Sequence, residues 1–416
     1  MTTRYFITFH NGIFFKSFIC VLLVLLPNMV MSESKNINIW LNYETEKKFT
    51  QSTYQDDFHK ETIGFEIKAN KNKVYSNLTL NLKKNKKIVF DHSYLTYSIR
   101  NNSVGIGKIA RHWSFSPRSS LILSSNSRPS DSIFFTIANK DKSTKPILSW
   151  IGPWSIEAFN SSLSNKNTTK DTMLLGTRIV FEPINHFKFE LVKTSQWGGS
   201  GNSNSLSAFS KAIIGNTNDN KHSKINQLAG FGLSYLLPTK KSNLTIYGQF
   251  IGEDEAGGLP SCYMYLYGTE WVFPEKKYLK KLGFELIDTR IDETTMGACG
   301  PNTAYNNSSY QYTNYDISLG SPIDTESKSI SFWTTSSLSP NINLNYSLEK
   351  FLLNDTGWDN HRLTSTQKKG WTNSLSLILE KESYKIQSKL SHQSFNLDNA
   401  QNSKGLSLKI NILNSF

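Results

Sequence analysis

The feature that most constrains this chain is an alternation of apolar and polar residues that recurs along most of its length. In NINIWLNYE (36–44), four apolar residues fall on one side of the alternation and three asparagines on the other. Further examples are SNLTLNL (76–82), HFKFEL (186–191) and NINLNYSL (341–348). Successive side chains of a β-strand point to opposite faces, so the pattern predicts strands with one apolar and one polar face.

Two architectures use such strands. A soluble sandwich buries the apolar face against a second sheet, whereas a membrane barrel turns it to lipid and keeps the polar face in its lumen. The asparagine-rich faces suit a hydrated lumen, and no segment after the N-terminus reaches the roughly 18 apolar residues of a membrane helix. We predict an all-β fold, an outer-membrane β-barrel of roughly 16–18 antiparallel strands over residues 33–416. One short helix is expected on a loop, at SLSAFSKAII (205–214).

The N-terminus predicts export. Arg4 and Lys16 precede or flank the short apolar core SFICVLLVLL, which indicates a signal peptide over residues 1–32 with cleavage after Ser32. The alternative is an uncleaved anchor helix. The whole chain carries a formal charge of +13, and cleavage removes two positive charges and no negative ones, which leaves +11.

The C-terminus favours the barrel. GLSLKINILNSF (405–416) alternates branched aliphatic residues with Ser407, Lys409 and Asn411, and it ends on Phe416. A final alternating strand with a terminal aromatic residue is similar to the closing strand of outer-membrane barrels. The barrel assembly machinery inserts such barrels into the outer-membrane lipid, so we expect both as partners of this chain.

Several stretches of the chain resemble the Wzi-type capsule assembly proteins, a family of outer-membrane lectins. They are HWSFSPRSSLILSSNSRP (112–129), TSQWGG (194–199), NQLAGFGLSYLLP (226–238), YGQFIGEDEAGGLPSCYMYLYGTEW (247–271) and, more weakly, NTAYNNSSYQYTNYDISLG (302–320). The resemblance covers about half of the chain in the family's order. It implies a large closed barrel that binds capsular polysaccharide at the cell surface and is not an enzyme.

The chain departs from the family pattern in three places. Strand-like alternation begins by Asn36, where family members commonly carry a helical bundle. Cys262 stands where an arginine usually follows LPS, and SFSPR replaces the usual Gly-Pro after Trp113. We therefore expect the helical bundle to be absent or much reduced in this chain.

The acidic motif of Glu253, Asp254 and Glu255 allows four interpretations. They are a pair of catalytic carboxylates, a calcium site, a solvated loop and an ion-pair hub. We favour the hub, because Arg–carboxylate pairs are strong and a buried acidic trio without cations is costly. Its expected partners are Arg111, Arg118, Arg128 and Arg290, and the acids are expected to hold inward loops in place.

Lectin sites stack aromatic rings on sugars and bind the hydroxyl groups with planar polar side chains, and an acidic sugar adds arginine or lysine. The candidates for polysaccharide binding are Arg111, Trp113, Arg118, Arg128, Gln196, Trp197, Tyr263, Tyr265, Tyr310 and Tyr312. The alternative for the aromatic residues is a girdle at the membrane interfaces. We expect the polysaccharide to be anionic, because the chain is basic.

Cys262 and Cys299 are predicted to form a disulfide. They are the only cysteines left after signal cleavage, and export leads to an oxidising compartment. A strand from Cys262 to about Trp271 and its return along 281–290 bring the loop 291–309 back to the side of Cys262. Counting strands back from Phe416 places that side in the periplasm. The alternative is two free thiols too far apart to bond.

Other chemistries have little support. The eight histidines show no metal-binding spacing, and Gly-x-Ser-x-Gly is absent. We expect no cofactor, no metal and no nucleic-acid partner. Two rivals to the lectin remain: a porin or oligosaccharide channel with an open lumen, and a barrel enzyme acting on lipid or glycan through HWS (112–114) and the acidic motif.

Overall fold

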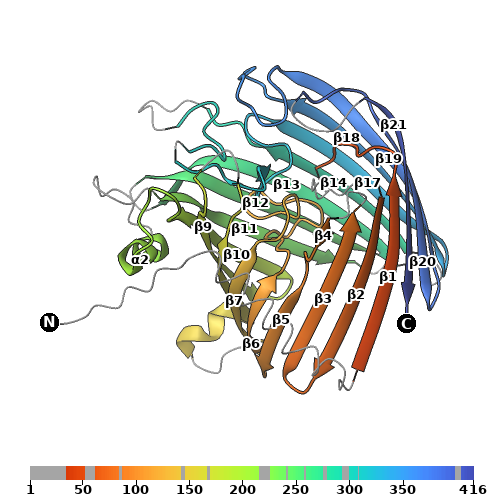
Figure 1. Cartoon of the computed structure of the whole chain (residues 1–416), viewed down its shortest axis with the longest axis horizontal. Coiled ribbons are helices and arrows are strands. Elements are labelled where there is room, and N and C mark those ends of the chain that lie inside the picture. The colour runs from red at the N-terminus through yellow and green to blue at the C-terminus, as the bar shows by residue number, and fades with distance from the viewer. Residues whose placement is uncertain are drawn as a thin grey trace.

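The computed structural model describes residues 34–51, 61–83, 87–141, 146–165, 169–214, 225–239, 242–256, 259–274, 279–292, 299–307, 309–398 and 404–416. Eighteen strands form one closed antiparallel β-barrel (Figure 1), which confirms the predicted fold and strand number. The ring closes where β1 pairs with β21, with Asn38 opposite Ser415.

The barrel strands are β1 (Ser34–Glu44), β2 (Glu61–Lys71), β3 (Val74–Lys83), β5 (Tyr94–Ile99), β6 (Asn102–Lys108), β7 (Asp131–Asn139), β8 (Trp154–Ser162), β9 (Met173–Ile184), β10 (Phe187–Trp197), β11 (Asn226–Pro238), β12 (Asn243–Ala256), β13 (Leu259–Pro274), β14 (Leu279–Asp288), β17 (Lys328–Ser339), β18 (Ile342–Leu353), β19 (Lys368–Glu380), β20 (Tyr384–Gln393) and β21 (Gly405–Ser415). Three strands of two residues each lie on the connections: β4 (Ile88–Val89), β15 (Thr313–Asn314) and β16 (Ile317–Ser318).

The helical content is small. The helix α2 (Leu206–Ile214) lies on the connection from β10 to β11, which confirms the predicted short helix. A 3₁₀ helix, η1 (Pro146–Ile151), precedes β8. No helix among the described residues is long and apolar enough to cross a membrane. The predicted signal peptide, residues 1–32, lies outside the described residues.

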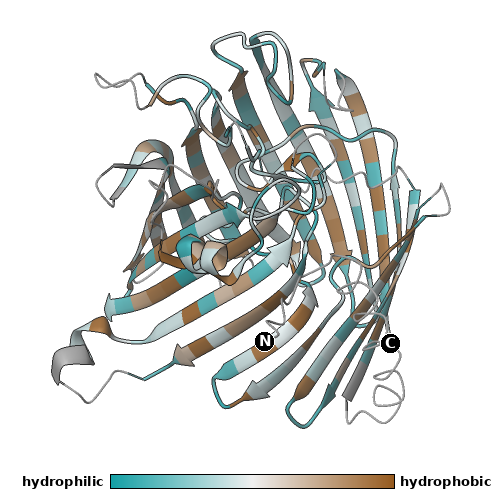
Figure 2. Cartoon of the chain, turned by 60° about the vertical axis from the view of Figure 1, so that its left-hand side comes forward, coloured by the Kyte–Doolittle hydropathy of each residue, from teal (hydrophilic) through white to brown (hydrophobic). Residues whose placement is uncertain are grey.

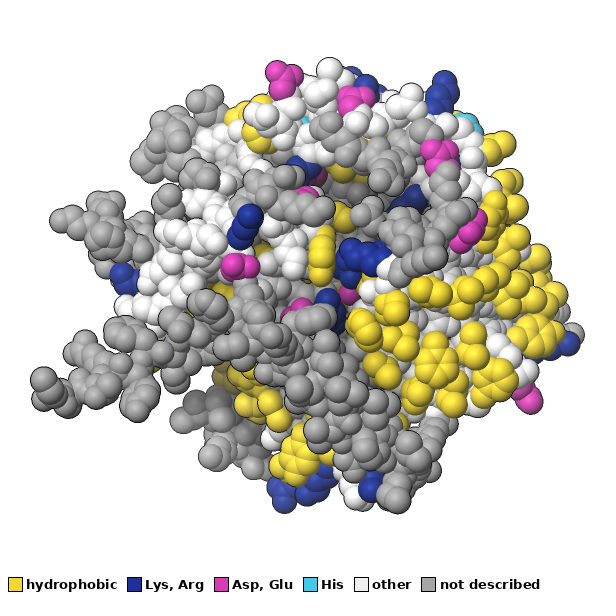
Figure 3. Space-filling model, viewed as in Figure 1, with side chains coloured by type: hydrophobic (Ala, Val, Ile, Leu, Met, Phe, Trp, Pro, Cys, Tyr) yellow, Lys and Arg dark blue, Asp and Glu magenta, His cyan; other side chains and the backbone are white. Residues whose placement is uncertain are grey.

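The period of two sorts side chains between the outside and the lumen. On β1, Ile39 and Leu41 are 42% and 47% exposed on the outer face, whereas the preceding Asn38, on the opposite face of the strand, is 9% exposed. Figure 2 shows hydrophobic and hydrophilic residues alternating along many strands. Figure 3 shows hydrophobic side chains gathered over the outer face of the strands at the right of the view. Such an outer face suits contact with lipid.

The two ends of the barrel differ. Tight turns join β2 to β3, β5 to β6, β9 to β10 and β17 to β18 at one end, and long connections such as 109–130 and 289–327 lie at the other. Phe416 is at the short-turn end, where its backbone exchanges hydrogen bonds with Ile37 at 2.8 and 3.2 Å. Short turns are typical of the periplasmic end of such barrels.

The side assigned to the acidic motif from the sequence is wrong. The connection from β12 to β13 lies at the long-loop end, opposite Phe416, because five barrel strands follow the 289–327 connection: β17, β18, β19, β20 and β21. In an antiparallel barrel an error of one strand in the count moves a loop to the other end.

The apolar core lies inside the long-loop half of the barrel. Inward loops supply Leu121, Ile122, Tyr305 and Tyr312, all at most 1% exposed. They pack against lumen-facing strand residues such as Met264. The loops therefore form a plug, which we define as the described inward segments 109–130 and 299–327.

Candidate functional site

The plug is held by tyrosine hydroxyl groups that donate to backbone carbonyls. Tyr305 Oη donates to Leu121 O at 2.6 Å, and Tyr312 Oη donates to Ile122 O at 2.8 Å. The rings of the two tyrosines are stacked with centroids 5.8 Å apart. The two inward segments therefore bind one another through buried polar contacts, which are costly to break.

The four arginines expected at the acidic motif pair with other carboxylates. Arg111 Nε lies 3.1 Å from Glu157 Oε1, and its guanidinium stacks 3.9 Å from the centre of the Phe159 ring. Burial lowers the pKa of Arg111 to about 10, although Glu157 opposes the shift. Arg128 binds Asp91 through two nitrogens, at 2.7 and 3.0 Å.

The other two arginines are bound in the same way. Arg118 Nη2 donates to Glu349 Oε1. Arg290 binds Asp288 at 2.7 Å and Asp355 at 3.1 Å, and these bonds raise its pKa. Each of these arginines is thus bound by a carboxylate outside the acidic motif. Pairing with the motif itself stays a prediction, because the side chains of Asp254 and Glu255 lie outside the described residues. The partners of Arg111, Arg118 and Arg128 are 37 or more positions away in the sequence and were therefore not foreseeable, whereas Asp288 lies two residues from Arg290.

The acidic motif does hold an inward loop. Glu253 is buried, and its Oε2 accepts a hydrogen bond from Tyr305 N at 2.9 Å. The side chains of Asp254 and Glu255 lie outside the described residues. No group of three or more His, Cys, Asp or Glu among the described residues is placed to hold a metal ion.

The predicted aromatic candidates fall into two groups. Trp113, Trp197, Tyr310 and Tyr312 are buried, as is Gln196, whose Nε2 donates to Gln311 O at 2.9 Å. Their contacts are with the plug and the wall, and Trp197 also packs against Phe209 of α2, with ring centroids 5.3 Å apart. A ligand could reach these side chains only if the loops moved.

The tyrosine ladder of β13 lies on the outer face. Tyr265 is 38% exposed there, and Tyr267 stacks on it with ring centroids 6.2 Å apart. Tyr263 has the same orientation by the alternation of the strand. These positions match the girdle interpretation, in which the rings lie at the membrane interface.

Cys262 and Cys299 are joined as a disulfide. Their Cα atoms lie 5.6 Å apart, and the bond closes a sequence separation of 37 residues. It ties the start of β13 to the loop that follows β14, so it anchors one end of the plug to the barrel wall.

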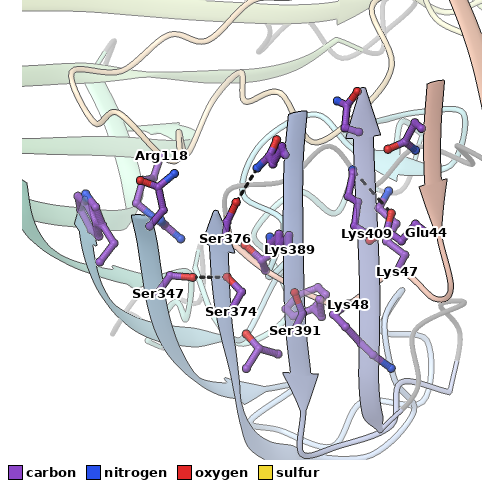
Figure 4. A pocket seen from close by; sticks show the side chains of 18 of the residues that line it. Glu44, Lys47, Lys48, Arg118, Ser347, Ser374, Ser376, Lys389, Ser391 and Lys409 are labelled. Carbon is purple, nitrogen blue, oxygen red and sulfur yellow. Dashed lines mark hydrogen bonds and ion pairs between the residues drawn. The ribbon is translucent and has the colours of Figure 1, made fainter. Parts of the chain in front are cut away.

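A cavity of about 780 Å³ remains in the lumen beside the plug (Figure 4). Toward the long-loop end the cavity is bounded by Phe49, Arg118 and Glu349. Its lining continues along the strands to Leu413, near the short-turn end. Side chains of hydroxyl or amide type dominate the wall: Asn42, Thr62, Thr79, Asn81, Thr334, Thr335, Asn345, Ser347, Thr372, Asn373, Ser374, Ser376, Gln387, Ser391 and Asn411.

Two tryptophan rings lie against this wall over glycines. Trp40 is opposite Gly64, where a Cβ atom would come within 1.9 Å of the indole, and Trp333 is opposite Gly283 with a corresponding distance of 2.1 Å. A larger residue at either glycine would displace the ring. The glycines therefore let each indole lie along the wall as part of the cavity lining.

Sequence reasoning did not identify this cavity. Its residues come from strands at both ends of the chain, and none of them except Arg118 was a predicted ligand-binding residue. The signal that was available is the polar face of the closing strand, where Lys409 and Asn411 alternate with aliphatic residues.

Comparisons with known proteins agree on the type of protein. The model of a family described as "Capsule assembly protein Wzi" matches residues 40–405. A Klebsiella pneumoniae protein, described as an uncharacterized 55.8 kDa protein in cps region, is 32% identical over 174 residues. That alignment covers 41% of this chain and 34% of the relative, so the chain matches about a third of the length of that relative.

Solved structures share the fold. Wzi of Escherichia coli, described as an outer-membrane protein involved in group 1 capsule assembly and as a carbohydrate-binding β-barrel, has a TM-score of 0.79 and 21% identity. The alignment covers 95% of this chain and 87% of that one. OccK5 of Pseudomonas aeruginosa has a TM-score of 0.51 and 8% identity, with 92% and 97% of the two chains covered.

Proposed function

The chain belongs to the family of the capsule assembly protein Wzi, and on that premise we propose that it binds capsular polysaccharide at the bacterial outer membrane and serves the assembly or attachment of the capsule. The observation that carries the proposal is the family match over residues 40–405 together with a closed barrel of matching fold. The apolar outer face supports a place in outer-membrane lipid.

Export and insertion form part of the proposal. A signal peptide over residues 1–32 would direct the chain across the inner membrane. The barrel assembly machinery would then insert the mature domain, 33–416, with the alternating strand β21 and Phe416 as the terminal signal. The disulfide between Cys262 and Cys299 is consistent with an oxidising compartment outside the cytoplasm.

The plug favours a binding protein over an open channel. Buried side chains of the inward loops pack on the strands β7 to β18 in the long-loop half of the lumen. A porin needs a continuous aqueous path, which such packing obstructs. Purified protein in planar bilayers is therefore expected to be electrically silent.

The residues that were considered for catalysis, in HWS (112–114) and in the acidic motif, are engaged in structural contacts. His112 Nε2 bonds to Ser116 O at 2.7 Å, and burial lowers the pKa of this histidine. Glu253 accepts a backbone N–H of the plug. These contacts support a protein without catalysis.

A deletion strain tests the proposed function. Loss of the protein should shift capsule from the cell-bound to the shed fraction, and expression of the wild-type chain should restore retention. Equal cell-bound capsule with and without the protein would contradict the proposal.

The anionic character of the polysaccharide is tested separately. Binding of purified capsule to the purified barrel should weaken as salt rises, because charge contacts are screened over about 8–10 Å at physiological ionic strength. Binding that does not depend on salt, or equal binding of a neutral glucan, would contradict an anionic ligand.

A further inference from the structure

One row of side chains runs across five neighbouring strands at the same level of the luminal cavity. Glu44 on β1 lies opposite Lys409 on β21, and Lys409 lies opposite Lys389 on β20. The row continues to Ser376 on β19 and Asn345 on β18. All five side chains line the cavity, and Figure 4 shows Lys389 and Lys409 projecting into it from adjacent strands.

The two lysines form a like-charged pair, and the one acid of the row, Glu44, lies on the far side of Lys409 from Lys389. Lys409 Nζ lies 3.7 Å from Glu44 Oε2. Within the part of the chain that the structure describes, Lys389 Nζ has no hydrogen bond and no ion pair. Like charges directly opposite each other across two strands are destabilising. A positive charge held in this position without an acid of its own would be stabilised by an anion bound in the cavity.

The cavity as a whole has an excess of positive charge. Lys47, Lys48, Arg118, Lys389 and Lys409 line it, against the three carboxylates Glu44, Glu66 and Glu349. The carboxylate of Glu349 is already bound by Arg118 and by Thr50 Oγ1, the latter at 3.0 Å. It is therefore not a dedicated partner for Lys389.

The rest of the lining fits a sugar ring better than a bare anion. Ser347 and Ser374 hydroxyls bond to each other at 2.8 Å across the strands β18 and β19, and Gln387 Nε2 donates to Ser376 Oγ at 3.0 Å. Such groups can exchange partners with sugar hydroxyls. Trp40 adds aromatic surface of the type that packs on sugar rings, whereas the ring of Trp333 is covered by the guanidinium of Arg118 at 4.9 Å.

We propose that this luminal cavity binds an acidic sugar unit, a hexuronate, with its carboxylate at Lys389 and its hydroxyl groups on the serine and amide side chains of the wall. The proposal rests on the proposed function, since it names the class of sugar and places it inside the barrel, beside the plug. The volume of about 780 Å³ lies within the range of about 300–1,000 Å³ of ordinary ligand pockets.

The test is a binding titration of the purified full chain in detergent. The probes are trigalacturonate, the neutral trisaccharide maltotriose and inorganic phosphate, each followed by calorimetry. The wild type is expected to bind trigalacturonate in preference to maltotriose. Lys389→Gln should weaken trigalacturonate binding about tenfold or more, because it removes a charge-assisted contact.

Lys385→Gln is the matched control. Lys385 is on the same strand and pairs with Glu380 at 3.1 Å, outside the cavity lining. This variant should bind like the wild type. Lys389→Gln should also unfold at the same temperature as the wild type or higher, because it removes the repulsion from Lys409. If Lys389→Gln binds trigalacturonate more weakly but unfolds at the wild-type temperature or higher, the loss is due to the binding site and not to misfolding.

Three results would overturn the inference: unchanged trigalacturonate binding in Lys389→Gln, equal loss in Lys385→Gln, or displacement of trigalacturonate by equimolar phosphate, which would indicate a general anion site. Capsule retention by cells that express each variant distinguishes failure of the luminal-site proposal from failure of the proposed function. Retention by the wild type together with unaffected binding in Lys389→Gln refutes the luminal site alone. Unchanged retention in the deletion strain refutes the proposed function itself.

Discussion

The hydroxyl group of Tyr305 is predicted to be a main fastening of the plug. It donates to Leu121 O at 2.6 Å and accepts a hydrogen bond from Ser321 N at 3.1 Å, so one buried oxygen joins both inward segments. Burial raises the pKa of Tyr305 well above its usual value, which keeps the hydroxyl protonated as a donor. Tyr305→Phe removes this oxygen and keeps the ring that stacks on Tyr312.

The expected destabilisation of the plug in Tyr305→Phe follows from two backbone groups that lose their hydrogen-bond partner, Leu121 O and Ser321 N. Leu121 and Ser321 are fully buried, and an unsatisfied buried polar group costs about 1–3 kcal/mol. Two such groups cost at least about 2 kcal/mol, which raises the population of the open plug at least about 30-fold. The barrel strands keep their pairing, so the effect should be confined to the plug.

Hydrogen–deuterium exchange of the purified protein measures this effect. Amides of residues 119–123 should exchange at least about 30-fold faster in Tyr305→Phe, while amides of β12 and β13 remain protected. Bilayer recordings should show rare openings where the wild type is silent. Tyr267→Phe, on the outer face and 45% exposed, is the matched control. Exchange in Tyr305→Phe equal to that of the wild type, or equal acceleration in the control, would refute the reasoning.

Three further predictions concern the terminus, the disulfide and pH. Deleting Phe416 removes its backbone bonds to Ile37 and should lower the level of heat-modifiable folded barrel; normal levels would contradict this. Cys262→Ser should lower the free energy of unfolding by about 3–4 kcal/mol in the chain-entropy model. Two reactive thiols in the denatured, unreduced wild type would contradict the disulfide. Burial lowers the pKa of His361, whose ring accepts Leu363 N, so its stabilising contribution is present above about pH 6.5 and lost as pH falls. Protection factors in residues 353–368, which correct amide exchange for its intrinsic pH dependence, should therefore fall from pH 7.5 to 5 in the wild type and fall less in H361Q, and an equal change in both would refute this role.

Much of the barrel could be predicted because its information is local. An alternation of two residues sorts each strand into a lipid face and a lumen face, whatever the strand pairs with. That pattern predicted the architecture, the range of strand number, the closing strand and the short helix that interrupts the pattern at Leu206–Ile214. Two cysteines and a run of strand, turn and strand were enough to predict that Cys262 and Cys299 meet.

The carboxylates that bind the arginines could not be predicted in this way. Arg118 lies next to Glu349 because an inward loop meets the strand β18, and Arg128 lies next to Asp91 because two separate loops meet in the lumen. Local composition favoured the acidic motif as their partner, yet a charge pairs with whichever carboxylate the fold brings within a few ångströms. The end of the barrel that carries the acidic motif depended on the parity of the strand count, which no local pattern fixes.

Which residues face lipid and which face the lumen therefore follows from the order of residues in each strand, since that depends only on the period of a strand. Which lumen residues meet depends on how the strands and loops are assembled. Closure of the ring sets Glu44, from the first strand, beside Lys409 of the last, and the register of β20 sets Lys389 beside Lys409. The polar cavity they share exists because the barrel closes and the plug leaves that part of the lumen open, and both are properties of contacts between segments far apart in the chain.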